Sequence, residues 1–236
     1  MQVATKRFTK SDYLRAVIAQ IPFFESLSEA ERAQIVDCAR CVSYRRDQYV
    51  FRAGDTAEVG AFLVQGLVAL TTAGAHDRPL GIEVIAAPEP FGVLAVINQI
   101  PYPLSALVLE PAVTMEVPAD IIRTIVERSA QLKSSLLAIA ASRFCEAQHV
   151  IQSLAGSSAR ARIAYALLLL LKRLKAPRSG PPLLPVTRKQ LACLGGTTVE
   201  TAIRTMKQFE QEGIVRMPKL RCVEIVRPDS LERIAA

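Results

Sequence analysis

The most constraining feature of this 236-residue sequence is a stretch from Ala119 to Ala155 that contains neither glycine nor proline. Apolar residues recur through it at helical spacing, so it predicts one or two α-helices, the second of them long. These residues are Ile121, Ile125, Leu132, Leu136, Ile139, Ala140, Phe144, Ala147 and Ile151. Such a segment in mid-chain divides the protein into three parts, which we expect at residues 1–126, 127–156 and 157–236.

The second helix carries a narrow apolar stripe that one small domain does not need. We expect it to pair with the same stripe of a second chain, because narrow apolar stripes are typical of helical dimer seams. The expected seam residues are Leu136, Ala140, Phe144, Ala147 and Ile151. The sequence therefore predicts a parallel homodimer formed through residues 127–156.

The first part has the pattern of an antiparallel β domain. Short apolar or alternating runs between Tyr44 and Val117 are separated by turn residues, which is typical of a sandwich or roll. The clearest runs are Tyr49–Phe51, Ala61–Val64, Val68–Thr72 and Ala106–Leu109, with turns at Gly54-Asp55, Gly66, Gly74 and Pro88–Pro90. Before them, a capping box of Ser28 and Glu31 predicts a short helix that ends near Cys38.

The third part has the pattern of a winged helix-turn-helix. Ser157-Ser158 is the expected N-cap of a first helix, and Thr187 with Gln190 forms a capping box for a second. Gly195-Gly196 breaks the chain, and Thr197 with Glu200 is the expected capping box of a third helix that ends at Gly213. The segments Ile214–Met217 and Cys222–Val226 predict a β-hairpin wing.

Charge is unevenly distributed between these parts. Residues 1–156 hold 14 Lys and Arg against 16 Asp and Glu, a net −2, and residues 157–236 hold 15 against 6, a net +9, which together give +7. A basic C-terminal third indicates a polyanionic partner for that third, and nucleic acid is the leading candidate.

Composition excludes several other classes of protein. Apolar residues make up 50% of the chain, which argues against disorder, and even a long apolar run such as Ala164–Leu171 is too short for a membrane span. Residues 1–20 show no signal-peptide core, and the five cysteines suit a reducing compartment, so we expect a cytoplasmic protein without a membrane partner.

Four segments, in order along the chain, resemble the CRP/FNR family of bacterial transcription regulators. They are Phe24-Glu25-Ser26-Leu27-Ser28, Phe51-Arg52-Ala53-Gly54-Asp55, Phe62-Leu63-Val64-Gln65-Gly66 and Val186-Thr187-Arg188. The resemblance covers about residues 24–236. It implies an α+β protein with a cyclic-nucleotide-binding type β-roll, a long dimerisation helix and a C-terminal winged helix-turn-helix. It also implies a palindromic double-stranded DNA site, a second copy of the chain and RNA polymerase as partners.

The third predicted C-terminal helix is similar to the recognition helix of the fumarate and nitrate branch of that family. Val199-Glu200-Thr201-Ala202-Ile203-Arg204 stands against the pattern Val-Glu-Thr-Ile-Ser-Arg, so Glu200 and Arg204 match and Ile203 replaces the serine that helps to read a thymine. The resemblance implies a half-site core of TTGAT type. It places base or groove contacts at Thr198, Val199, Glu200, Thr201 and Arg204.

Residue chemistry supports Glu200 and Arg204 independently. An arginine near the start of a recognition helix can donate to guanine O6 and N7, and a carboxylate can accept from cytosine N4. The alternative is a surface salt bridge between residues four apart on one helix. Phosphate contacts are expected from Arg188, Lys189, Lys207, Lys219 and Arg221, and the alternative for these is a solvated face.

The expected effector pocket departs from the family's cyclic-nucleotide pattern. Its positions are Gly92, Val93, Leu94, Leu104 and Ser105, with Ala147 and Gln148 on the dimer helix. Cyclic-nucleotide binders of the family have glutamate where Val93 stands and arginine where Leu104 stands. No Lys or Arg occurs between Arg78 and Arg123 to offset a phosphate charge. We therefore expect no ordinary binding of cyclic AMP and no cofactor.

The cysteines leave three interpretations open. Cys38-x2-Cys41 resembles half of a metal site, but neither histidine is placed to complete it, so no metal site is expected. Buried structural thiols are the leading interpretation, and a redox switch at Cys145 or Cys193, or an iron–sulfur or haem gas sensor, are the alternatives. A β-roll interaction module whose winged helix contacts protein is a further alternative. No nucleophile or acid–base pattern predicts an enzyme.

Overall fold

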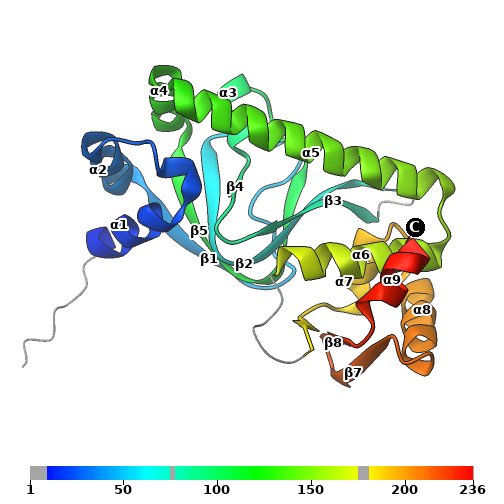
Figure 1. The fold of residues 1–236 in the computed structure, drawn as a ribbon. Helices are drawn as coiled ribbons and strands as arrows, with labels where there is room; N and C mark the ends of the chain where they lie inside the picture. Colours follow the sequence, from blue (N-terminus) through cyan, green and yellow to red (C-terminus); the bar gives the residue numbers. More distant parts are fainter. Residues whose placement is uncertain (1–9, 75–77, 175–180, 236) are drawn as a thin grey trace, which may run out of the picture.

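The computed structural model describes residues 10–74, 78–174 and 181–235. Figure 1 shows a β-sheet domain with small helices at one end, one long helix that runs along it, and a C-terminal domain beneath the far end of that helix. This is the expected α+β order of a β-roll, a long helix and a winged helix-turn-helix. No helix in these residues is long and apolar enough to cross a membrane.

The N-terminal helices are α1 (Lys10–Gln20), a 3-10 turn (Pro22–Phe24) and α2 (Glu29–Cys38). The predicted capping box of α2 is confirmed, because Ser28 Oγ accepts from the Glu31 amide at 3.3 Å while the Ser28 amide donates to Glu31 Oε2 at 2.8 Å. Helix α1 lies outside the sequence-based prediction. It covers one end of the sheet through buried Leu14 and Ile18.

The β-roll is antiparallel, as predicted. Its strands are β1 (Arg40–Tyr44), β2 (Val59–Ala73), β3 (Pro79–Ala86), β4 (Pro90–Phe91) and β5 (Ser105–Pro118). They lie in the order β1-β5-β2-β3, and β4 pairs with β2. The short helix α3 (Val93–Asn98) follows β4 and packs on the same domain.

Two predicted details of the roll are wrong. Gly66 does not separate two strands, because β2 continues through it with a positive φ of 95° and a shifted register. A Cβ at this position would lie 2.4 Å from the Pro111 carbonyl oxygen, so the close approach of β5 requires glycine. The run Tyr49–Phe51 is not a strand either, since Tyr49 makes only an isolated bridge to Leu107.

The glycine-free stretch forms two helices, α4 (Ala119–Arg128) and α5 (Ala130–Gly156). Ser129 ends the first and caps the second, since its side chain accepts from the Leu132 amide at 3.2 Å. The long helix therefore begins at Ala130, and the predicted boundary at residue 127 falls inside α4.

The C-terminal domain contains α6 (Ala159–Arg173), α7 (Arg188–Leu194), α8 (Val199–Gln211) and α9 (Pro228–Ala235). Its small sheet has the order β6 (Leu183–Leu184), β8 (Cys222–Ile225), β7 (Val215–Lys219), and β7 and β8 form the predicted wing. The cap at Ser158 and the capping box at Thr187 are confirmed. The predicted capping box at Thr197 is wrong by one residue, because Thr198 caps α8 by accepting from the Thr201 amide at 3.1 Å.

The C-terminal domain is docked on the β-roll through one shared hydrophobic core. Side chains of β2, β3 and β5 pack with those of α6, α7 and α8 in this core. Gly81 of β3 permits the contact, because a Cβ there would lie 2.6 Å from Leu194 Cδ2. The buried side-chain amide of Gln190 donates to the Leu109 carbonyl oxygen at 2.8 Å. The domain is therefore held on the sheet and not only by its linker.

Candidate DNA interface and effector pocket

Helix α8 has one buried face and one solvent-facing polar face. Ala202, Thr205, Met206 and Phe209 are buried against the domain core. Glu200, Arg204 and Lys207 are exposed and lie four and three residues apart, so they share the opposite face. Ile203, the residue that departs from the family pattern, is also exposed. The helix thus offers an acidic group, two basic groups and an apolar side chain to a partner.

Glu200 and Arg204 are not paired with each other. The ion pairs of the described residues do not include one between them. The pKa of Glu200 is lowered by its own backbone amide and then by the Thr198 hydroxyl, with a smaller contribution from Arg78. The carboxylate therefore stays ionised and is held by the start of its own helix, which leaves Arg204 available to a partner.

The residues predicted to contact phosphate do not lie in equivalent environments. Lys189, Lys207, Lys219 and Arg221 are exposed. Arg188 is half-buried and donates to the Met217 sulfur, so it links α7 to the wing. At the wing tip, Leu220 is 86% exposed between Lys219 and Arg221. Four of the five basic side chains are thus accessible in this arrangement.

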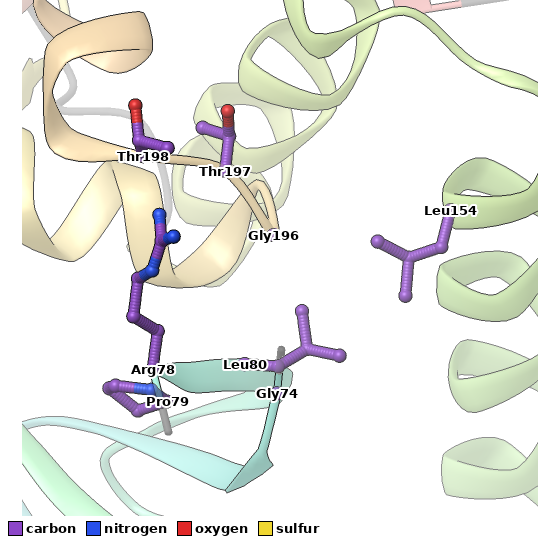
Figure 2. A pocket seen from close by; sticks show the side chains of 8 residues that line it. All are labelled: Gly74, Arg78, Pro79, Leu80, Leu154, Gly196, Thr197 and Thr198. Carbon is purple, nitrogen blue, oxygen red and sulfur yellow. The ribbon is translucent and has the colours of Figure 1, made fainter. Parts of the chain in front are cut away.

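The beginning of α8 lies against the hairpin formed by β2 and β3. Figure 2 shows Arg78 extending from the hairpin toward Thr198, with Leu80 facing Leu154 of α5 across the gap. A cavity of about 380 Å³ separates these elements, and Thr197, Thr198 and Gly196 line its far side. Thr197 and Thr198 are therefore half-buried beside the β-roll, whereas Glu200 and Arg204 face solvent. No local sequence signal indicated this contact.

A second cavity, of about 320 Å³, lies between the β-roll and α5. Four of the predicted effector positions line it, namely Gly92, Leu94, Leu104 and Ala147. The other lining residues are Phe51, Leu70, Ile82, Glu83, Ala95, Tyr102, Pro103, Ala140, Arg143 and Phe144. Glu83 and Arg143 are the only charged side chains among them, and neither was predicted.

Three predicted effector positions do not line this cavity. Val93 is buried in the N-terminal core beneath it. The Ser105 hydroxyl accepts from the Ala53 amide at 2.9 Å, so it closes a loop of the roll. Gln148 is exposed on α5.

Glu83 and Arg143 belong to a group of five charged side chains, which we name the charge cluster: Glu83, Glu89, Arg143, Glu146 and Arg173. Arg143 Nε lies 3.1 Å from Glu83, and Arg173 lies 4.0 Å from Glu83, 3.0 Å from Glu89 and 2.6 Å from Glu146. The cluster joins β3 and the β3–β4 loop to α5 and α6. Burial raises the pKa of Glu83 to about 7, and Arg143 opposes this effect.

The outer face of α5 carries an unpaired apolar stripe. Leu137, Phe144 and Ile151 are 72%, 64% and 65% exposed and lie seven residues apart. Ala140 and Ala147 border the stripe and line the effector cavity. Leu136, which was expected in the dimer seam, is buried in its own chain's core. Periodicity missed this because Leu136 and Leu137 are adjacent, and only the position of the sheet shows which one faces solvent.

The cysteines do not form a recognisable centre. Cys38 and Cys41 are half-buried, Cys145 is exposed and Cys193 is buried. Burial raises the pKa of Cys193 to about 11, so this thiol is poorly reactive at neutral pH. Within the described ranges, no three His, Cys, Asp or Glu side chains are grouped so that they could hold a metal ion.

Comparisons with known proteins agree with both parts of this geometry. Residues 41–129 match the family model of the cyclic nucleotide-binding domain, and residues 161–234 match that of the Crp-like helix-turn-helix domain. The chain is 27% identical over 216 residues to the cyclic AMP receptor protein of Thermus thermophilus, covering 91% of this chain and 96% of the relative. It is 27% identical over 198 residues to the anaerobic regulatory protein of Haemophilus influenzae, covering 83% and 76%. The fold is similar to that of FixK2 from Bradyrhizobium japonicum, with a TM-score of 0.73 and 20% identity over 84% of this chain and 98% of that one.

Proposed function

The chain belongs to the CRP/FNR family of transcription regulators, and from this we propose that it acts as a homodimer that binds one palindromic DNA site and does not bind cyclic AMP in the usual way. The observation that carries the proposal is that Glu200 and Arg204 of α8 are exposed and form no ion pair with each other, within a helix-turn-helix of a basic domain. RNA polymerase is the proposed partner at the promoter.

Chemistry at α8 supports direct reading of a G·C pair. Arg204 presents a forked donor to the guanine acceptors of the major groove, and Glu200 presents an acceptor to the cytosine amino group. Exposed Lys189, Lys207, Lys219 and Arg221 would add affinity for phosphates without reading sequence. Ile203 offers only apolar contact, so the outer bases of the half-site are expected to differ from those that the serine pattern selects.

The stripe of Leu137, Phe144 and Ile151 supports the dimer. Burial of these three exposed side chains against a second copy would remove a contiguous apolar surface from water. A dimer with two-fold symmetry would present two copies of α8, and each would bind one half of a palindrome.

Selection of bound sequences from random duplex DNA tests the proposal. The purified full-length protein is used without ligand, once reduced and once oxidised, and enriched sites are sequenced. We expect a palindrome with half-sites about 34 Å apart and a G·C pair in each half. The same protein is also applied to a heparin column at increasing salt concentration. If no DNA sequence is enriched and retention on heparin does not depend on salt, the alternative of a protein-contacting winged helix is favoured. A site found only in one redox state would favour a thiol switch.

Cyclic AMP should leave the melting temperature unchanged. Val93 is buried in the core and Leu104 is apolar, so neither provides a ribose or phosphate contact. A ligand present at 100 times its dissociation constant would add about 2.7 kcal/mol to the free energy of unfolding. Differential scanning fluorimetry with millimolar cyclic AMP checks this, and a clear upward shift would contradict the proposal.

A further inference from the structure

The cavity between the β-roll and α5 offers little to an anion. Arg143 is its only cationic side chain, and this guanidinium is already engaged. Its Nε lies 3.1 Å from Glu83, and its Nη2 donates to the Pro90 carbonyl oxygen. An anionic ligand would therefore have to share this guanidinium with Glu83, which is itself buried and negatively charged when ionised.

The rest of the charge cluster adds to this effect. Glu83, Glu89 and Glu146 provide three carboxylates against the two guanidiniums of Arg143 and Arg173. When all five groups are ionised, the cluster carries one excess negative charge beside the cavity. Repulsion from partly buried charges is weakly screened, so a phosphate, sulfonate or carboxylate would be disfavoured beside Glu83.

The remaining walls provide apolar and aromatic contacts. The rings of Phe51 and Tyr102 stack with their centroids 3.8 Å apart, and Tyr102 lies at one side of the cavity. Leu70, Ile82, Leu94 and Leu104 complete this surface from the strands and loops of the roll. Small-molecule sites commonly have this composition, in which apolar walls surround a few polar groups. A volume of about 320 Å³ limits the occupant to a small molecule.

We propose that this cavity binds an uncharged, predominantly apolar small molecule, of the size of two or three linked rings, as the effector of the regulator. The assignment of an effector rests on the proposed function, whereas the ligand chemistry rests on the cavity itself. The ligand would contact the roll and, through Ala140, Phe144 and Ala147, the proposed dimer helix. Arg143 and Arg173 connect the same wall to α6 of the DNA-binding domain.

Two fluorescent probes that share one skeleton test the ligand class. N-phenyl-1-naphthylamine is uncharged, and 8-anilinonaphthalene-1-sulfonate has the same rings with one added sulfonate. Each is titrated into the full-length protein at pH 8, where Glu83 is largely ionised. We expect the neutral probe to saturate at about one per chain and to bind at least about tenfold more tightly than the sulfonate, a difference of about 1.4 kcal/mol.

Paired arginine variants locate the binding. Leu104→Arg places a cation in the cavity wall, so it should weaken the neutral probe and strengthen the sulfonate. Ile100→Arg is the matched control, because Ile100 is exposed and does not line the cavity. It should change neither affinity. If Leu104→Arg does not fold, Pro103→Arg on the exposed rim makes the same comparison.

Three results would overturn the proposal. The first is equal affinity for the two probes, and the second is neutral-probe binding that is the same in Leu104→Arg and Ile100→Arg. The third is a dimer that binds neither probe, which would mean that the second copy's helix fills the cavity. Probe binding is measured without DNA, so failure here is distinct from failure to select a DNA site.

Discussion

At the scale of single residues, two exposed cations of α8 allow base readout to be tested against simple phosphate attraction. Arg204 and Lys207 are both exposed cations on the same helix, three residues apart. A positive surface alone would make them equivalent. Direct readout makes them different, because only a side chain that meets a base edge depends on sequence.

Arg204→Ala should weaken the selected site by roughly 1–3 kcal/mol and relax the preference at one G·C pair. Lys207→Ala should weaken selected and random DNA about equally and flatten the salt dependence by about one unit if it contacts phosphate. Fluorescence anisotropy on the site and its single-base variants measures both. If Arg204→Ala ranks those variants as the parent does, the readout assignment is wrong.

The buried carboxyl group of Glu83 should make the free energy of unfolding depend on pH. Its pKa in the folded protein is raised to about 7 by burial, whereas an unfolded glutamate titrates near 4.5, so the folded state binds the extra proton between these values. Stability contributed by Glu83 is present below about pH 4.5 and is lost as pH rises toward 7. Arg143, Arg173, Glu146 and Glu89 are the charged groups around it.

Glu83→Gln should therefore reduce the fall in stability between pH 5 and pH 8, by an amount on the order of 2–3 kcal/mol. Urea denaturation of both proteins across this range measures the difference. Glu89 and Glu110 also have pKa values raised by burial, so part of the slope should persist. Parallel curves for the two proteins would show that Glu83 does not titrate in this window.

At the scale of elements, α5 has two apolar surfaces on different sides. Leu132, Leu136 and Val150 are buried against its own chain, and the stripe of Leu137, Phe144 and Ile151 faces outward. A spacing of seven residues keeps one seam along a helix. The cavity-lining alanines lie between these two sides, so one helix can contact ligand and second copy together.

Phe144→Asp should split the dimer, because it would place an unpaired carboxylate in an apolar seam. Sedimentation at micromolar concentration should report a monomer for this variant. Ser142→Asp is the matched control, since Ser142 is exposed on another side of the same helix and should leave the dimer intact. A dimer that persists in Phe144→Asp would place the interface elsewhere.

At the scale of the whole molecule, the DNA-binding domain and the β-roll share one core. Leu194 lies directly against Gly81 of β3, and Gln190 reaches the Leu109 carbonyl oxygen of β5. The hairpin of β2 and β3 also lies beside the start of α8 (Figure 2). A change at the roll can therefore reach α7 and α8 by direct contact.

Gly81→Val should loosen this contact, because a Cβ there would lie 2.6 Å from Leu194 Cδ2 and 3.2 Å from Leu194 Cα. Overpacking of this kind costs about 1–3 kcal/mol, and amide exchange should accelerate in α7. Valine suits a strand, so the effect would come from space and not from propensity. Gly156→Ala is the control, since nothing lies within 4 Å of its Cβ. Equal rates of amide hydrogen exchange in α7 of the two variants would contradict the contact between α7 and β3.

What the sequence determined by itself was local or additive. The caps at Ser28, Ser158 and Thr187 involve residues three apart, and the charge of the C-terminal third is a sum, so neither depends on distant parts of the chain. Motif order was sufficient to predict the β-roll, the long helix and the winged helix-turn-helix. Four of the predicted effector positions, which came from the motif alone, line the cavity between the β-roll and α5.

Only the tertiary structure decided what depends on residues far apart in sequence. Arg143 meets Glu83 and Arg173 meets Glu89, pairs that are 60 and 84 residues apart, and no local pattern links such positions. Leu136 and Leu137 are alike in type, and the sheet alone determines that the first is buried and the second exposed. Burial and ion pairing arise only when distant segments pack together. The sequence around the effector positions of the β-roll contains no Lys or Arg, whereas the folded protein brings Arg143 to the cavity and pairs it with Glu83.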